Sequence, residues 1–209
     1  MYLPRHFTED STDAAVAMSR TAGFGHLVIH GADALASTPM PFLISDDGVS
    51  VRGHLARPNA IWRAAPCEAL LIVPVSDAYV SPSWYPSKAE HGKVVPTWNY
   101  EVVHLHGRLI AHDDAEWTGS LVRELTELNE SVLPRPWSVG DAPADYIDQL
   151  MRGIVGVEIT VDRIETKRKL SQNKSAADIA GVIRGLADAD LPGAGNVQRA
   201  MGAVATDVG

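Results

Sequence analysis

Three short segments of the sequence combine basic, hydroxyl and aromatic side chains next to predicted strands: RGHLARPN (52–59), YVSPSWYPSK (79–88) and VPTWNY (95–100). Arginine and lysine bind phosphate through charge-assisted hydrogen bonds, hydroxyls add neutral ones, and an aromatic surface can cover a conjugated ring. Together the segments are suited to an anion that carries a flat ring. Between them the segments supply Arg52, Arg57, Ser81, Ser83, Trp84, Tyr85, Lys88, Thr97, Trp98 and Asn99.

Each of these residues, taken alone, has a simpler explanation. Tryptophan and tyrosine are more often core or interface residues, and single lysines and arginines usually lie on a solvated surface. The concentration of all three residue types in three segments is what favours a ligand site.

Other chemistry is less well supported by the sequence. The chain has eight histidines, and His104 and His106 lie two residues apart, but no HExxH or CxxC spacing accompanies them. We therefore predict no metal site, and we interpret the histidines as hydrogen-bonded strand residues or residues at a subunit boundary. No GxSxG elbow, GxGxxG turn or GxxxxGK[ST] loop is present. No residue can be assigned a catalytic role.

Length and composition indicate one globular domain with helical additions. The chain has 209 residues, of which 45% are hydrophobic and 21% charged, within the ordinary range for soluble domains. No apolar stretch approaches the roughly 20 residues of a membrane-spanning helix, and the first residues do not resemble a signal peptide. With the single cysteine, Cys67, expected to be a packed thiol, this predicts a cytoplasmic protein with no membrane partner.

The charge of the chain bears on its partners. The formal net charge is −8, which opposes nucleic-acid binding unless basic residues cluster. One basic run exists, RIETKRKLSQNK (163–174). A solvated strand edge, whose charges discourage edge pairing, explains it as well as a binding role does.

The pattern of apolar residues predicts strands alternating with a few helices. Val103, Leu105, Gly107 and Leu109 fall on one face of a long strand, opposite the face of His104, His106 and Arg108. A strand of this length usually bends around a barrel, so the sequence predicts an antiparallel β-barrel of the α+β class. The expected strands are 24–31, 39–45, 49–56, 69–80, 95–112 and 154–170, with a turn at 46–48, and the expected helices are 9–23, 57–63, 114–129, 141–151 and 175–186.

Two helix starts carry specific signals. Asp141 is expected to cap the helix over 141–151, with Pro143 in its first turn, and Ser175 with Asp178 resembles a capping box. The last segment, 187–209, is rich in small residues and is expected to be a tail, either helical or mobile. We therefore divide the chain into a barrel domain, 1–186, and this tail.

Several motifs in fixed order resemble the PaiB family, described as FMN-binding negative transcriptional regulators within the FMN-binding split-barrel superfamily. The resemblance runs from Met1 to about Leu186, with one departure at Asn59-Ala60, where the family often has Asn-Pro. It implies a mostly antiparallel, Greek-key-like split β-barrel with peripheral helices. The motifs that carry it are MYLPRHF, RGHLARPNAIW, DAYVSPSWY, VPTWNYEVVHLHG and KLSQNKS.

The resemblance further implies a homodimer with FMN near the subunit interface. Arg57 and Lys88 would pair with the FMN phosphate, and two serine hydroxyls would hydrogen-bond to it. Residues 97–99 would lie near the isoalloxazine ring or ribityl chain, and Gln172 would close the ring edge. The cofactor-binding residues implied in this way are His54, Arg57, Asn59, Ser81, Ser83, Trp84, Lys88, Thr97, Trp98, Asn99 and Gln172.

Three functions follow as hypotheses. The first is a PaiB-type regulator that senses redox state or a metabolite through FMN; DNA is a possible partner by the family description, although the acidic charge argues against direct contact. The second is a flavin-dependent oxidoreductase or flavin reductase that uses NAD(P)H. The third and weakest is a haem-binding split-barrel protein.

Overall fold

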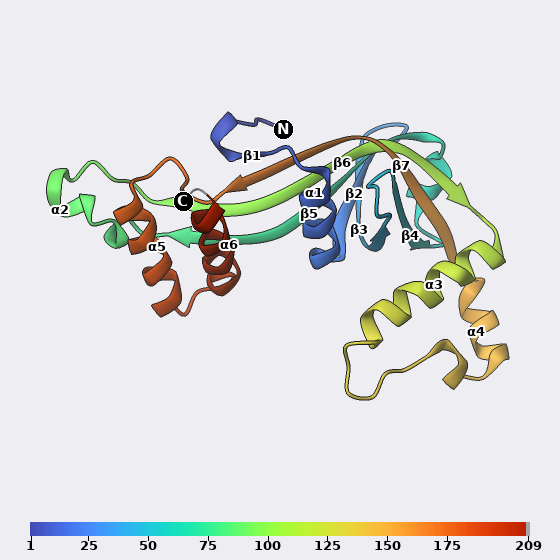
Figure 1. Ribbon diagram of the computed structural model, residues 1–209. Helices are drawn as coiled ribbons and strands as arrows, with labels where there is room; N and C mark the ends of the chain where they lie inside the picture. Colours follow the sequence, from blue (N-terminus) through green and yellow to red (C-terminus); the bar gives the residue numbers. More distant parts are fainter. Residues whose placement is uncertain (208–209) are drawn as a thin grey trace. The chain divides into compact units, whose positions relative to one another are not determined.

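The fold is an antiparallel sheet with six α-helices and four short 3-10 helices, and the computed structural model describes residues 1–207 (Figure 1). The strands are β1 (Thr8–Glu9), β2 (Phe24–His30), β3 (Leu35–Ile44), β4 (Ser50–Ala56), β5 (Cys67–Val80), β6 (Thr97–His112) and β7 (Ile154–Lys169). The helices are α1 (Thr12–Ala22), α2 (Ser87–His91), α3 (Ala115–Glu130), α4 (Ala144–Met151), α5 (Ala176–Asp188) and α6 (Ala194–Asp207), and the 3-10 helices are η1 (Arg5–Phe7), η2 (Ala60–Ala64), η3 (Pro82–Trp84) and η4 (Val139–Asp141).

The seven strands pair in the order β1-β7-β4-β3-β2-β5-β6, and a further pairing joins β7 to β6. That pairing closes a ring of six strands, and the registers of β1–β7, β2–β3, β2–β5, β3–β4 and β4–β7 are all antiparallel. The predicted antiparallel barrel of the α+β class is therefore confirmed.

The chain forms two compact units, which are described separately. The first unit comprises residues 1–11, 74–103 and 165–207, and the second comprises residues 12–73 and 104–164. Because β5, β6 and β7 are long, each contributes residues to both units.

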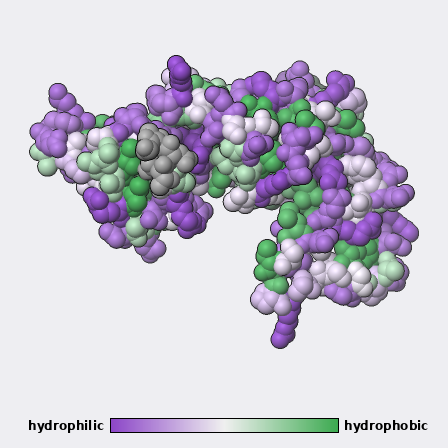
Figure 2. Space-filling view, in the orientation of Figure 1, coloured by the Kyte–Doolittle hydropathy of each residue, from purple (hydrophilic) through white to green (hydrophobic). Residues whose placement is uncertain are grey.

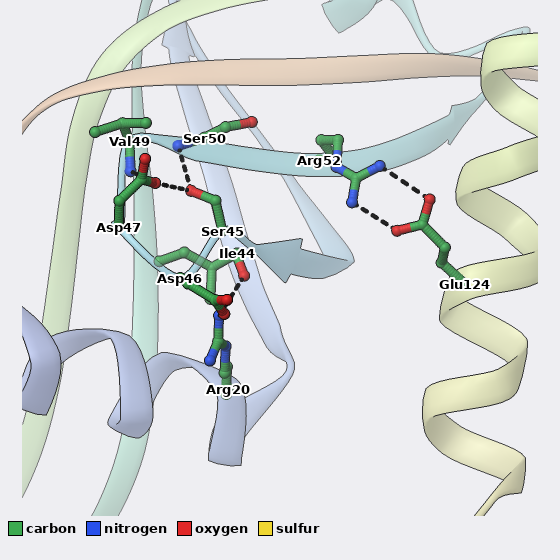
Figure 3. A network of polar contacts seen from close by, with 9 residues as sticks. All are labelled: Arg20, Ile44, Ser45, Asp46, Asp47, Val49, Ser50, Arg52 and Glu124. Carbon is green, nitrogen blue, oxygen red and sulfur yellow. Dashed lines mark hydrogen bonds and ion pairs between the residues drawn. The ribbon is translucent and has the colours of Figure 1, made fainter.

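In the second unit, the turn between β3 and β4 forms a polar network (Figure 3). Asp47 accepts hydrogen bonds from the Ser45 hydroxyl at 2.6 Å and from the Val49 backbone N–H at 3.1 Å. The Ser45 hydroxyl oxygen accepts in turn from the Ser50 backbone N–H at 3.0 Å. Gly48 has a φ of +73°, a conformation that side chains disfavour. These contacts form the hairpin that the sequence predicts here.

The alternation predicted for β6 is present. Leu105 and Leu109 are fully buried, and His104 and His106 between and beside them are only partly buried. Gly107 lies on the buried face because no larger residue fits there: a Cβ atom would lie 2.0 Å from the backbone oxygen of Thr160. This close backbone approach belongs to the second unit.

In the first unit, α5 and α6 lie beside each other and pack with the end of β5 (Figure 1). The Ser175 hydroxyl accepts from the Asp178 backbone N–H at 3.2 Å, so the predicted helix cap is confirmed. Residues 194–207 of the segment expected to be a tail form α6. The buried residues of this cluster are Ala78, Val80, Tyr85, Leu170, Val182, Leu186, Ala194, Val197 and Met201.

Two predicted helix starts differ from the structure. The brief helix near Pro58 begins at Ala60, because the Asn59 side chain caps it by accepting from the Ile61 backbone N–H at 3.0 Å. Asp141 does not cap α4; it ends η4, where its carboxylate accepts from the Ser138 backbone N–H at 2.8 Å. A local 3-10 turn therefore takes up the capping residue, and α4 begins after Pro143.

The region of α3 and α4 brings hydrophobic side chains to the surface of the second unit, and green residues are visible there at the lower right of Figure 2. Across residues 1–207, no helix is both long and apolar enough to span a membrane. The exposed residues are Leu128, Val132, Leu133, Trp137, Tyr146 and Leu150.

Candidate functional site

The segment after β5 brings three of the predicted residues of the first unit into contact. The Lys88 ammonium group donates to the Ser83 hydroxyl oxygen at 3.0 Å. The Ser83 backbone N–H donates to the Ser81 hydroxyl oxygen at 3.2 Å. Lys88 and Ser83 are exposed and Ser81 is partly buried, so the three residues form a small, accessible group of donors. We call it the Lys88 cluster.

The local sequence explains this arrangement. Pro82 occupies the start of η3, where its fixed φ suits a helix start and its missing N–H costs no bond. Tyr85 is 3% exposed and anchors the segment in the core of the first unit. The Ser87 hydroxyl and backbone N–H both donate to the Asp178 carboxylate, at 2.9 and 3.1 Å. The turn that carries Lys88 is therefore held at both sides.

Trp84 packs mainly on α5. A Cβ atom on Gly185 would lie 2.3 Å from ring atoms of Trp84, and one on Gly181 would lie 2.2 Å from the Trp84 backbone oxygen. The ring is partly buried against the helix. Its predicted role of covering a flavin remains a prediction, and its observed contact is structural.

The start of β6 presents Trp98 to solvent and Asn99 to the interior. Trp98 is 54% exposed and meets Tyr79 edge to face, with ring centroids 6.2 Å apart. The buried Asn99 amide exchanges hydrogen bonds with the Ser171 hydroxyl, at 3.0 and 3.2 Å, and lies 3.3 Å from the sulfur of Met201. Trp98 is thus available to a flat ring, whereas the amide of Asn99 is already bonded within the first unit.

Lys169, at the end of β7, also contacts the start of β6. Its ammonium group donates to the Thr97 hydroxyl oxygen at 2.7 Å and to the Trp98 backbone oxygen. Burial lowers the pKa of Lys169, and the positive charges of Lys167 and Lys174 lower this pKa further. The sequence alone did not assign these lysines to the site, because a solvated strand edge would carry the same pattern of basic residues.

The Gln172 side chain folds back onto the end of β7. Its side-chain oxygen accepts from the Leu170 backbone N–H at 2.8 Å, and its side-chain NH2 group donates to the Arg168 backbone oxygen at 2.6 Å. Ser171 beside it has a φ of +67°. The amide therefore holds a tight turn, and a contact with a flavin edge remains a prediction.

In the second unit, Arg57 uses four of its five N–H donors in hydrogen bonds. Its guanidinium donates to both carboxylate oxygens of Asp113, at 2.7 and 3.1 Å, and to the backbone oxygens of Arg152 and Ile154, at 2.7 and 3.1 Å. Hydrogen bonds from Arg57 hold the pKa of Asp113 below its usual value. The pair lines a pocket of about 410 Å³ with residues of α3 and α4. A bidentate phosphate contact by Arg57 would need an exchange with Asp113.

His54 and Asn59 complete the predicted residues of the second unit. The Asn59 amide caps η2 and also donates to the Thr38 hydroxyl oxygen at 3.1 Å. His54 lies on the same face of β4 as Arg52, which pairs with Glu124 of α3 through hydrogen bonds of 2.6 and 3.2 Å (Figure 3). Within residues 1–207, the buried Nδ1 of His54 has no hydrogen-bond partner.

The predicted site residues therefore fall into two separate sets. The first unit holds the Lys88 cluster, Trp84, the start of β6 and Gln172, and the second unit holds His54, Arg57 and Asn59. The members of the Lys88 cluster contact one another. Gln172 and Asn59 instead form hydrogen bonds with nearby backbone groups.

Comparison with known proteins identifies the family. The family described as "Putative FMN-binding domain" matches residues 1–163. The chain belongs to this family. FMN, the cofactor that the resemblance implied, is thus the cofactor of the family to which the chain belongs.

Relatives of this family support the resemblance to PaiB. The Bacillus subtilis protein named "Protease synthase and sporulation protein PAI 2" is 31% identical over 201 residues, covering 93% of each chain. An Emericella nidulans protein is 32% identical over 188 residues, covering 72% of this chain and 74% of its own. An Aspergillus fumigatus protein is 40% identical over 122 residues, and the match spans 47% of its length.

Solved structures show the same fold at low sequence identity. The flavocytochrome Anf3 from Azotobacter vinelandii has a TM-score of 0.59 at 14% identity, covering 86% of this chain and 78% of that chain. The FAD and heme binding protein from Mycobacterium smegmatis also has a TM-score of 0.59 at 14% identity, covering 88% and 81%. These matches confirm the split-barrel fold.

The residues of the first unit fit the chemistry of FMN. A phosphate monoester accepts from an ammonium group and from hydroxyls, which is the donor set of the Lys88 cluster. An isoalloxazine ring needs a flat, accessible aromatic neighbour, and Trp98 with Tyr79 offers one. This donor set and this aromatic pair lie in one compact unit.

His54 leads to a prediction of how the stability of the folded protein depends on pH. Burial lowers the pKa of His54 in the folded protein. The ordinary pKa of histidine is about 6.5. Below that pH, His54 binds a proton more readily in the unfolded chain than in the folded chain, so the folded state loses stability as the pH falls. We expect cofactor-free protein to lose stability between pH 7.5 and 5.5 in urea unfolding, and the His54→Gln variant to lose less. Equal losses in both proteins would remove His54 as a cause.

Proposed function

We propose that the protein is an FMN-dependent sensor of redox state or of a metabolite, of the type described for PaiB regulators. The observation that carries the proposal is the Lys88 cluster, in the same unit as the exposed pair Trp98 and Tyr79. The donors suit a phosphate and the aromatic pair suits a flavin ring. Family membership supplies the identity of the cofactor.

Individual roles follow from the contacts. Lys88, Ser83 and Ser81 would bind the phosphate, with Lys88 contributing the only formal charge of the three. Trp98 would lie against the ring, and Thr97, held by Lys169, would offer its hydroxyl oxygen. When bound, FMN supplies the electron-transfer chemistry, and the protein sets its orientation and access.

Asn99 and Gln172 would act as positioning residues. Asn99 fixes the start of β6 through Ser171, and Gln172 fixes the turn at the end of β7. Neither amide has to touch the flavin for its loss to disturb the site. The same argument applies to Trp84, whose ring sets the distance between its turn and α5.

The second unit would contribute Arg57, His54 and Asn59. Four of the five N–H donors of Arg57 are in use, so a two-point contact with a phosphate would require the phosphate to replace Asp113. A homodimer, in which such residues could come from a partner subunit, is part of the proposal. Light scattering with and without FMN measures it: a dimer supports it, and a monomer in both states contradicts it.

A sensor is favoured over a direct DNA-binding protein by charge. With a net charge of −8 the chain repels a polyanion, so regulation would pass through another partner. The single thiol, Cys67, has a pKa raised by burial, which is typical of an unreactive cysteine. The proposal includes a cytoplasmic location, which fits a chain whose single cysteine cannot form an internal disulfide.

Anaerobic reduction separates a sensor from a flavin reductase. We expect FMN bound to the purified protein to stay oxidised over minutes with excess NADH or NADPH, and to be reduced by dithionite. Dithionite reduction should change the protein's susceptibility to limited proteolysis. Rapid bleaching by either nucleotide, with turnover on readmission of oxygen, would replace the sensor with a reductase.

A further inference from the structure

The last residues of β7 carry two lysines whose charges are not neutralised. Arg168 points to the opposite face from Lys167 and Lys169, and it pairs with Glu101 at 2.9 Å and with Glu9 at 3.6 Å. Within the part of the chain that the structure describes, Lys167 and Lys169 form no ion pair. The charge of Arg168 is therefore neutralised on one face of this strand, whereas the charges of Lys167 and Lys169 on the other face are not.

Lys167 is the more unusual of the two because it is only 9% exposed. Its ammonium group donates to the Tyr2 backbone oxygen at 3.1 Å and lies 5.5 Å from the centroids of both the Tyr2 and Tyr100 rings. Aromatic rings and one carbonyl stabilise a cation only in part. A buried charge is costly unless an opposite charge pairs with it.

Lys169 adds a second positive charge beside the same ring. Its ammonium group is 5.9 Å from the Tyr100 centroid and bonds to the Thr97 hydroxyl. The carboxylate two positions before Lys167, that of Glu165, pairs with the N-terminal ammonium group of Met1. No carboxylate of the described residues therefore forms an ion pair with either lysine.

We infer that Lys167 and Lys169, with the Thr97 hydroxyl, bind the phosphate group of a small phosphorylated ligand beside Tyr100. A phosphate dianion would neutralise both ammonium groups and accept their remaining N–H donors. The proposed function places the FMN phosphate at the Lys88 cluster, so this inference goes beyond it and assigns the site to the phosphate of a second nucleotide. If the site instead held the phosphate of FMN, the phosphate role proposed for Lys88 would be wrong. A nucleic-acid polymer fits less well, because Lys167 is nearly buried and the chain is acidic.

The test uses inorganic phosphate as the probe, in isothermal titrations of the full chain at constant ionic strength. It compares the wild type with Lys167→Met and Lys169→Met in cofactor-free protein. We expect each variant to bind phosphate at least about tenfold more weakly, because a charge-assisted hydrogen bond is lost. Lys93→Met, which removes an exposed lysine of the same unit, should bind like the wild type.

Saturation with flavin distinguishes the two sources of phosphate. If the site holds the FMN phosphate, protein saturated with FMN binds no further phosphate at these lysines, whereas protein saturated with riboflavin still does. If the site serves a second nucleotide, both forms bind phosphate with the same dependence on Lys167 and Lys169. A protein that binds phosphate in this way but binds no flavin would contradict the proposed function and leave the inference intact.

Two outcomes would overturn the inference. One is phosphate binding that is absent, or equal in the wild type and both variants, with the variants shown to be folded by circular dichroism. The other is tight binding of a single-stranded oligonucleotide that depends on the same lysines and displaces phosphate, which would assign the site to a polymer.

Discussion

The Lys88→Met variant is expected to bind FMN about 10- to 100-fold more weakly than the wild type and to bind riboflavin equally well. Riboflavin lacks the phosphate, so only the phosphorylated ligand loses a partner. A hydrogen bond to a charged group contributes about 1.5–3 kcal/mol, which corresponds to this range of affinity. Lys88 is exposed, and among the described residues 1–207 its ammonium group bonds only to the Ser83 hydroxyl, so its removal leaves the fold intact. Equilibrium titration by flavin fluorescence measures both affinities.

Lys93→Met is the matched control for Lys88. Both lysines are exposed, both lie in the first unit, and they are five residues apart. A general effect of net charge would weaken FMN binding equally in the two variants. An unchanged FMN affinity in Lys88→Met, or an equal loss of riboflavin affinity, would remove Lys88 from the phosphate site.

The Gly107→Ala variant is expected to lose about 3 kcal/mol or more of its free energy of unfolding. The added Cβ would lie 2.0 Å from the backbone oxygen of Thr160, and backbone atoms cannot move aside as the end of a side chain can. Overpacking usually costs about 1–3 kcal/mol, and this contact is tighter than the usual case. Urea unfolding, followed by tryptophan fluorescence, gives the difference.

Gly119→Ala is the control for the same substitution in the same unit. Gly119 lies within α3, and the nearest atom to an added Cβ is 3.5 Å away on the Arg123 side chain. Alanine should therefore stabilise the helix by roughly 0.5–1 kcal/mol. If Gly107→Ala were as stable as the wild type, the close pairing of β6 with β7 at this position would be wrong.

The elements that sequence analysis predicted correctly are those fixed by neighbouring residues. Alternation along β6 depends only on every second residue, and the cap of α5 depends on Ser175 and Asp178, three residues apart. The hairpin turn at Asp47 is equally local. The prediction failed where two local patterns compete. Asp141 could complete a capping box with Ser138 at η4 or cap α4, and the sequence does not distinguish the two.

The site was predictable in composition but not in contacts. Trp84 meets Gly185, a residue 101 positions later, and Arg57 meets Asp113, and no short pattern contains either pair. The basic run near the end of β7 shows the same limit. Arg168 is neutralised whereas Lys167 and Lys169 are not, and this difference depends on Glu9 and Glu101 from other strands.

The central claim is that this chain binds FMN through its phosphate as well as its ring. Isothermal titration of the purified, cofactor-free protein with FMN and, in parallel, with riboflavin tests it most directly. The account predicts one FMN per chain and an affinity at least about tenfold above that for riboflavin. Failure to bind FMN, or equal affinity for the two flavins, would contradict it.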